Sequence, residues 1–397
     1  MFQKALLAAG LAGSLIGAQI PAGTKLELRL TSKVNSATAR ARDAFQAVVI
    51  APVVAGDSIV LGTGTKVAGH IKEVKPAEAA DQQTTLDLSF DRLEDSKGAG
   101  VTIDAKLTAV DNARETVDKD GRILGIVASK TGSARLDQGI NKVAEKYPGL
   151  AELLGTAKKS IVGETDASIN YPPGVEMTIE LTKPLDWIGE VKVPSVAPIP
   201  PTADLARLVN SEPYLTRAEK PPKPSDITNL MFLASEDELT RAFEGAGWSQ
   251  AKQLNGESKL ETFRAMVEDR GYKEAPVSTL LLDDRPADLA FEKINNTFAA
   301  RHHLRIWRRP GLFNGKPVWV CSATHDTGID FSEENRTFIH KVDFYIDRER
   351  AKVVNDLMFT GMVKGLALVD RPSVPTRGYN ATGDQILTDG RMAVLRF

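Results

Sequence analysis

The stretch RHHLRIW at residues 301–307 and the stretch VWVCSATHD at residues 318–326 decide how the second half of this chain folds. Both are rich in β-branched and aromatic residues, and the intervening residues 309–317 are rich in glycine, proline and asparagine. This pattern predicts two antiparallel strands joined as a hairpin. Residues 337–346 have a similar composition, which predicts a third strand next in the chain.

The turn of this hairpin determines which histidine faces which partner. A three-residue loop at residues 313–315 would pair His303 with His325, at a Cβ separation of roughly 4.5–5.5 Å. A two-residue turn at residues 314–315 would slip the register by one and pair His303 with Asp326. Either register gathers polar side chains, and the sequence leaves both open.

Four of the five histidines fall between residues 302 and 340, together with the only cysteine. Imidazoles that face each other across a hairpin can share a metal ion or a proton. The candidate metal ligands, with zinc as the possible ion, are His302, His303, His325 and His340, and the candidate catalytic residues are His303, His325 and Asp326. Hydrogen-bonded structural histidines are the alternative, because the spacing lacks the regularity of a zinc motif.

The length and composition indicate a two-domain, soluble globular protein. A chain of 397 residues exceeds a single ordinary core, and 42% hydrophobic with 26% charged residues is typical of globular proteins. The formal net charge of −2 gives no general attraction to nucleic acid, which is therefore not an expected partner. A single cysteine rules out an internal disulfide.

The first 18 residues have the form of a secretory signal peptide. One positive charge precedes an apolar run that is too short to span a bilayer, and small residues lead up to Ala18. Cleavage there predicts a periplasmic or secreted protein. No later stretch reaches the length of a membrane helix, so we expect no transmembrane helix in the mature chain.

Residues 20–190 read as an antiparallel β-barrel or sandwich, because alternating strands are bounded there by Gly, Pro, Asp and Asn. The segments PAGTKLELRL at residues 21–30 and PPGVEMTIEL at residues 172–181 both have a Pro-x-Gly turn before an alternating strand. We expect these two strands to lie near each other in the sheet. Residues 134–161 have helical spacing and predict a surface helix pair over one barrel end.

Residues 191–224 carry eight of the 21 prolines, which predicts an extended linker outside any core. Residues 225–397 combine helical patterns at 235–245 and 257–268 with the central hairpin, which predicts an α+β domain with a central antiparallel sheet.

A further helix is expected after the third strand, from Asp347 to about residue 360. Asp347 is placed to cap this helix. Arg348 and Arg350 in its first turn are unfavourable for the helix dipole, which indicates an ion pair or an anion contact.

Several separated motifs in the second half resemble the LssY carboxy-terminal domain family over about residues 226–370. The motifs are Asn229-Leu230, Ala246-Gly247-Trp248, Tyr272 with Ala275-Pro276-Val277-Ser278, the stretch 301–307, Val318-Trp319, Thr324-His325-Asp326 and Asp347-Arg348-Glu349-Arg350. The resemblance implies a domain that occurs alone or behind membrane domains of the lipid-phosphatase or DedA-like type, with no defined activity of its own. No lipid-phosphatase signature of the Pro-Ser-Gly-His kind occurs in this sequence.

Residues 20–24 (IPAGT) and 61–69 (LGTGTKVAG) resemble the β-barrel domain of the TrbI-like family, the outer-ring component of conjugation and type IV secretion channels. This likeness covers about residues 20–75 and implies an envelope β-barrel. The family's membrane helix and long proline-rich spacer do not occur in this sequence, so it implies no channel role.

Two functions of different classes follow. The first is an exported cell-envelope protein that acts as a ligand- or partner-binding module, with an envelope protein, a lipid or a polymer as the partner. The alternative is a metal-dependent or His/Asp-based hydrolase of phosphate esters or lipid head groups that uses the cluster of His303 and His325.

Overall fold

The fold is strand-rich and is known from a computed structural model that describes residues 18–55, 58–161, 166–191, 196–219, 222–251, 279–293, 300–332 and 337–397. Residues 1–17 of the predicted signal peptide (1–18) and the predicted helix at 257–268 lie outside these ranges. Among the described residues, no helix is both long and apolar enough to cross a membrane. The predicted fold class is confirmed: a nearly closed antiparallel barrel-like sheet precedes an α+β half.

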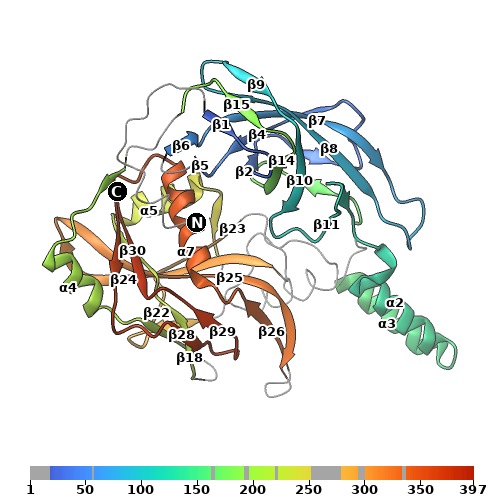
Figure 1. The fold of residues 1–397 in the computed structure, drawn as a ribbon. Coiled ribbons are helices and arrows are strands. Elements are labelled where there is room, and N and C mark those ends of the chain that lie inside the picture. The colour runs from blue at the N-terminus through green and yellow to red at the C-terminus, as the bar shows by residue number, and fades with distance from the viewer. Residues whose placement is uncertain are drawn as a thin grey trace.

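The N-terminal sheet has the strand order β10-β14-β2-β4-β7-β8-β12-β11, with β9 paired to β8 (Figure 1). Its strands are β2 (Lys25–Leu30), β4 (Ala44–Val49), β7 (Lys66–Lys75), β8 (Thr85–Glu94), β9 (Gly100–Thr102), β10 (Ala105–Val110), β11 (Thr116–Val117), β12 (Ile123–Leu124) and β14 (Glu176–Leu181). Three short antiparallel pairs flank it: β1 (Ala18–Ile20) with β15 (Leu185–Trp187), β3 (Val34–Asn35) with β13 (Asn170–Tyr171), and β5 (Val53–Ala55) with β6 (Ser58–Leu61).

Alternating apolar residues build the interior of this sheet. Leu26, Leu28 and Leu30 of β2 are buried. At the alternate positions Lys25 and Glu27 are exposed, whereas Arg29 is buried. The two strands with a Pro-x-Gly entry, β2 and β14, are direct antiparallel neighbours, as expected from their shared pattern.

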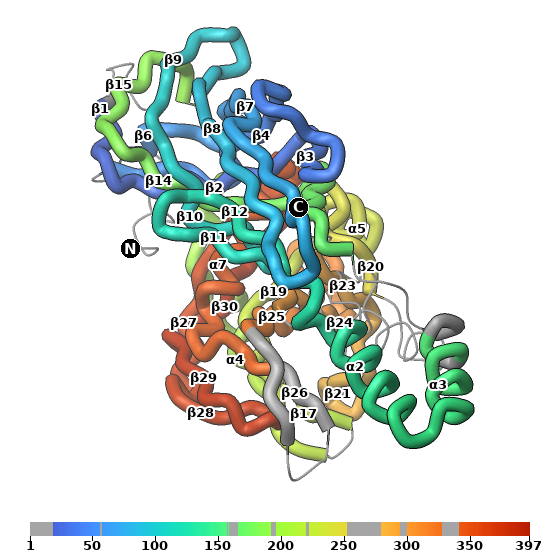
Figure 2. Tube along the Cα trace, turned by 90° about the vertical axis from the view of Figure 1, so that its right-hand side faces the viewer, coloured from blue at the N-terminus to red at the C-terminus, as the bar shows by residue number. Residues whose placement is uncertain are grey.

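A helical hairpin leaves this sheet after the short η2 turn (Ala128–Lys130). It consists of α2 (Gly132–Ala144) and α3 (Pro148–Ile161), and in two views it extends away from the barrel (Figures 1 and 2). The predicted position over a barrel end is therefore wrong. Helical periodicity shows which side chains share a face, but it does not determine which surface that face contacts.

The C-terminal sheet has the strand order β16-β27-β30-β19-β25-β24-β23-β20, with β26 paired to β25. Its strands are β16 (Ala197–Pro198), β19 (Leu230–Leu233), β20 (Trp248–Gln250), β23 (Leu289–Lys293), β24 (Arg301–Phe313), β25 (Lys316–Ser332), β26 (Thr337–Val342), β27 (Gly365–Asp370) and β30 (Arg391–Arg396). Its pairings are antiparallel except β16 with β27 and β19 with β30, which are parallel.

Helices α5 (Glu236–Gly245) and α7 (Ile346–Phe359) cover one face of this sheet, and α4 (Ala203–Ser211) covers the other. A small sheet of β18 (Pro224–Ile227), β17 (Leu215–Ala218), β21 (Leu280–Leu282) and β22 (Arg285–Pro286) adjoins α4, and β28 (Arg377–Tyr379) pairs with β29 (Gln385–Leu387). Helix α5 begins at the predicted capping box of Ser235 and Glu238.

The proline-rich residues 191–224 differ from the predicted extended linker. Val196 and Ile199 are buried in the cores of the C-terminal half, and so are Leu205 and Val209 of α4. Proline is tolerated here because β16 is an edge strand, where a missing backbone N–H breaks no ladder. A high proline content therefore indicates positions that donate no hydrogen bond within a sheet. It does not exclude burial of the residues between the prolines.

Helix α7 also begins differently from the prediction. Its N-cap residue is Tyr345, without a side-chain cap, and the carboxylate of Asp347 instead accepts hydrogen bonds from Thr388 Oγ1 at 2.8 Å and the Asp389 amide at 2.6 Å. The expected ion pair of Arg350 is present: its guanidinium donates to both carboxylate oxygens of Asp389, each at 2.8 Å.

This ion pair predicts a loss of stability in acid. Burial raises the pKa of Asp389, but Arg350 and Arg391 outweigh it and lower that pKa to about 2, against 3.8 without such neighbours. The ionised carboxylate therefore stabilises the folded state above about pH 4, and this contribution disappears as the pH falls toward about 2. We expect Asp389→Asn to lower the free energy of unfolding by about 1–2 kcal/mol at pH 7 and by clearly less at pH 3. Urea unfolding at both pH values checks this, with the exposed Asp204→Asn as control, and an equal loss at both would contradict it.

Candidate functional site

The central hairpin adopts neither of the two registers considered from the sequence. The turn is the two-residue one, because Phe313 pairs with Lys316. However, between the pairs Arg308–Trp319 and Leu312–Pro317, β24 has three residues where β25 has one, and Gly311 adopts a φ of 83° within this bulge. The register therefore shifts again beyond the bulge.

Beyond the bulge, His302 faces His325, and His303 faces Thr324. Since side chains alternate along a strand, His302 and His325 lie on the sheet face covered by α5 and α7, whereas His303 and Asp326 lie on the opposite face. The three candidate catalytic residues are therefore not brought together. His340 pairs through its backbone with Ile329, and its side chain lies outside what the structure describes.

On the opposite face, His303 lies within a buried polar network. His303 Nδ1 is 3.7 Å from a carboxylate oxygen of Asp326, and His303 Nε2 is 3.1 Å from the hydroxyl of Thr324. Arg301 donates to the same Asp326 oxygen at 3.2 Å. Burial raises the pKa of Asp326 to about 6, although Arg301 and Arg305 oppose it.

The face that carries His302 and His325 meets the end of β10 in the N-terminal sheet. The two imidazole rings stack at 4.0 Å between centroids, with 17° between their planes. His302 Nε2 is 3.0 Å from Asp111 Oδ2, and His325 Nε2 is 2.9 Å from Asn112 Oδ1. Donor atoms of Asp111, His302 and His325 all lie within 4.8 Å of one another. We call these three residues the junction site.

A carboxylate behind the junction site orients one of its rings. Glu349 of α7 is 3% exposed, and its Oε2 lies 2.7 Å from His302 Nδ1. This contact turns His302 Nε2 toward Asp111. The site therefore has donors from both halves of the chain and a buried partner for one of them.

The charges around the two rings move their pKa values in opposite directions. Burial lowers the pKa of His302, but the carboxylates of Glu349 and Asp111 outweigh it and raise that pKa to about 10. Burial, together with the positive charge of His302, lowers the pKa of His325 to about 4. His302 holds the pKa of Asp111 below its usual range despite burial.

Next to the junction site, five buried or half-buried charged residues connect the two halves. We call them the junction ion network: Arg29, Glu176, Lys293, Lys352 and Asp356. Glu176 of β14 accepts from Arg29 Nη2 and Lys293 Nζ, each at 2.7 Å, and from Lys352. Asp356 accepts from Lys293 Nζ at 2.9 Å and from Arg29 Nη2 at 3.2 Å.

One stripe of helix α7 supplies Glu349, which lies behind the junction site, and two members of the junction ion network. Glu349, Lys352 and Asp356 follow helical spacing toward the N-terminal sheet, whereas Val353 and Leu357 pack into the C-terminal core. The helix thus lies between the two sheets (Figure 1).

Sequence reasoning missed Asp111, Asn112 and Glu349. Asp111 and Asn112 follow a strand, and their sequence is typical of an ordinary turn. The pattern of the following helix would place a charged residue such as Glu349 on its solvent-facing side. The one hint near Glu349 was the unfavourable placement of Arg348 and Arg350 in the first turn of α7, which indicated an ion pair or an anion contact.

Residues 210–392 match the model of the family described as LssY C-terminus. The match covers just under half of the chain and confirms the resemblance expected from the motifs. It begins earlier than expected, within the proline-rich segment.

Among solved structures, ComB10 of the Com type IV secretion system of Helicobacter pylori is similar over 42% of this chain and 88% of that chain, with 10% sequence identity and a TM-score of 0.24. No curated protein matches this chain.

Proposed function

We propose that this protein is a metal-binding module of the cell envelope, in which Asp111, His302 and His325 hold a divalent transition ion. One observation carries the proposal: a carboxylate and two imidazoles from distant parts of the chain bring their donor atoms within 4.8 Å of one another. On binding, one ring would turn out of the stacked arrangement so that both imidazoles point at the ion. Nitrogen and oxygen donors of this kind suit zinc.

The surroundings of His302 support this proposal. A histidine that binds a metal usually donates its other ring N–H to a carboxylate, which determines the tautomer and the ring orientation. Glu349 stands at that position, 2.7 Å from His302 Nδ1. With Asp111 it supplies two negative charges, which match the charge of a divalent ion.

The ion would replace a proton. Imidazole binds a metal only in its neutral form, so binding would release the proton that otherwise lies between His302 Nε2 and Asp111. His325 is already held neutral near pH 7, because its pKa is about 4. The ion would therefore join the end of β10 to the central hairpin.

We further propose that the chain is divided into the segments expected from the sequence. A signal peptide at residues 1–18 directs the chain to the periplasm or the exterior, and the barrel (residues 20–190) and the C-terminal half (225–397) act as one binding unit. A protein, lipid or polymer of the envelope is the expected partner.

Metal content tests the proposal. We expect the chain, purified without a chelating tag from zinc-supplemented medium, to carry about one zinc ion per chain. His302→Ala combined with His325→Ala should remove it. His303→Ala is the matched control, because this neighbour lies on the other face of the sheet and should leave the zinc content unchanged. Zinc that persists in the double variant, or a folded wild-type chain without zinc, contradicts the proposal.

A metal-dependent hydrolase is the second candidate. Three protein ligands would leave a fourth coordination position for water. The side chain of Asp111 is 29% exposed, so water can reach the site. Hydrolysis of p-nitrophenyl phosphate by the zinc-loaded protein, lost in His302→Ala and kept in His303→Ala, would favour the enzyme. Bound zinc without turnover would favour the binding module.

A further inference from the structure

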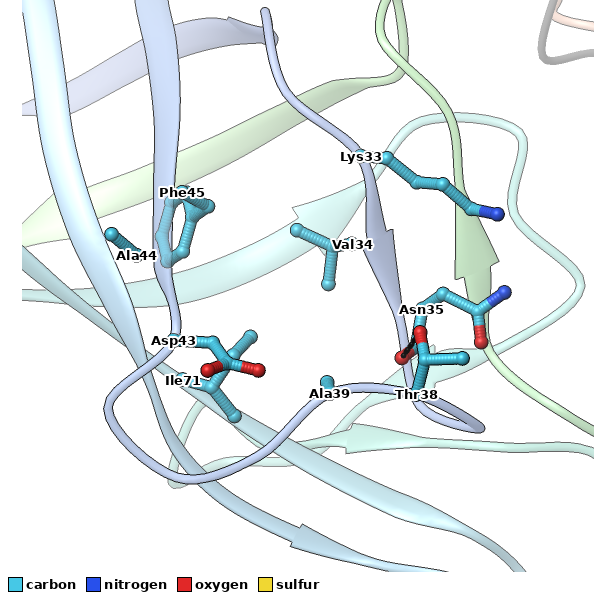
Figure 3. A pocket seen from close by; sticks show the side chains of 9 residues that line it. All are labelled: Lys33, Val34, Asn35, Thr38, Ala39, Asp43, Ala44, Phe45 and Ile71. Atoms are coloured by element: carbon cyan, nitrogen blue, oxygen red, sulfur yellow. Dashed lines mark hydrogen bonds between the residues drawn. The ribbon is translucent and has the colours of Figure 1, made fainter.

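A separate pocket lies in the N-terminal half, away from the junction site. Its volume is about 380 Å³, and it opens between β3, the loop after β3, β4 and β7 (Figure 3). The lining residues are Lys33, Val34, Asn35, Thr38, Ala39, Asp43, Ala44, Phe45 and Ile71. Pockets of this size are at the small end of ligand sites.

The floor of the pocket is apolar and rigid. Val34, Phe45 and Ile71 are each at most 3% exposed and belong to the core of the N-terminal half. The Phe45 ring meets Phe90 edge to face at 5.4 Å and lies so close to Gly69 that a Cβ there would be 2.4 Å from it. The floor therefore keeps its shape without a ligand.

The loop that forms the rim is also held in place. The Arg42 amide donates to the Ile71 carbonyl at 2.7 Å, and the Ile71 amide donates to the Asp43 carbonyl at 2.8 Å. Within the loop, Asn35 Oδ1 accepts from the Ala37 amide at 2.8 Å. A ligand would thus meet a formed site and order little on binding.

The lining of the pocket holds one positive and one negative residue, Lys33 and Asp43, and the loop that borders it adds two more positive ones. Lys33 lines the pocket, and Arg40 and Arg42 lie in the same loop; all three are exposed, and within the described ranges none of them forms an ion pair. The one acidic residue of the rim, Asp43, already accepts a hydrogen bond from the Arg40 amide at 2.7 Å. An anionic group is therefore favoured at the mouth.

We propose that this pocket binds a small carboxylate that carries a short branched or ring-shaped apolar group. The apolar group fills the floor formed by Val34, Phe45 and Ile71, and the carboxylate lies at the rim beside Lys33. The chemistry is the same for a free short-chain acid and for the C-terminal residue of a peptide. The proposal does not depend on the junction site.

A ligand-observed NMR titration with isovalerate tests this. We expect saturable binding with a Kd on the order of millimolar, because the probe has few atoms. Lys33→Glu should weaken it by about fivefold or more, and Ala39→Leu should abolish it by filling the cavity. Lys25→Glu, an exposed lysine outside the pocket, should change nothing.

Titrations with two further compounds define the class of ligand. The neutral isovaleramide should bind more weakly than isovalerate, and N-acetyl-leucine should bind more tightly if a peptide end is the source. Absence of saturation by isovalerate, or equal affinity in the wild type and Lys33→Glu, would overturn the proposal.

Discussion

Glu176→Gln is expected to lower the free energy of unfolding by about 3–5 kcal/mol. Glu176 is buried and is the common acceptor for Arg29, Lys293 and Lys352. Although burial alone would raise it, the pKa of Glu176 lies well below its usual range, chiefly because of Lys293. The carboxylate is therefore ionised and balances several cations in a site that water hardly reaches.

The expected loss of stability is large because the cations remain buried after the carboxylate is removed. Glutamine keeps the shape of the side chain and removes its charge. Lys293, which is 1% exposed, then keeps Asp356 as its one charged partner among the residues that the structure describes. An uncompensated buried charge destabilises far more than the loss of an exposed pair. The same substitution should also loosen the contact between the two halves, since Glu176 belongs to β14 and Lys293 to β23.

Urea unfolding followed by tryptophan fluorescence and circular dichroism measures this effect. Glu180→Gln is the matched control: it lies on the same strand, is half-exposed, and should change the free energy of unfolding by less than about 0.5 kcal/mol. If Glu176→Gln were as mild as Glu180→Gln, the junction ion network would have no stabilising role.

Glu349→Gln is expected to weaken zinc binding by about 10–100-fold, which rests on the proposed junction site. The Glu349 carboxylate orients His302 and makes Nε2 more basic through its contact with Nδ1. Glutamine can still accept from Nδ1, so the ring can keep its position. What is lost is the negative charge, which also contributes to the raised pKa of His302.

Competition with a chromophoric zinc chelator gives the affinity directly. Glu236→Gln, on the exposed side of α5, is the control and should bind zinc like the wild type. Unchanged affinity in a folded Glu349→Gln variant would remove Glu349 from the site, and loss of folding would be recognised by circular dichroism before the titration.

Local patterns in the sequence predicted the elements well where one face of a strand or helix is buried. The alternation in β2, the capping box of α5 and the Asn314-Gly315 turn each depend on a few neighbouring residues, so they can be read directly. The match of residues 210–392 to the LssY C-terminus family likewise agrees with the motifs.

The candidate site was predicted only in part. Clustered histidines pointed to the right hairpin, but the two-residue turn puts His303 and His325 on opposite faces, and the bulge at Gly311 then brings His302 opposite His325. The choice between a three-residue and a two-residue turn shifts the register by one and so moves a side chain to the other face, whereas the bulge depends on how the strand bends around the core.

By itself, therefore, the sequence determined which segments form strands and helices, and that imidazoles gather on the central hairpin. The tertiary structure alone decided that His302 and Asp111, 191 residues apart, become partners, and that Glu349 stands behind them. The physical reason is that hydrophobic periodicity acts over a few residues. The choice of a buried charged partner depends instead on how two separately patterned halves pack against each other.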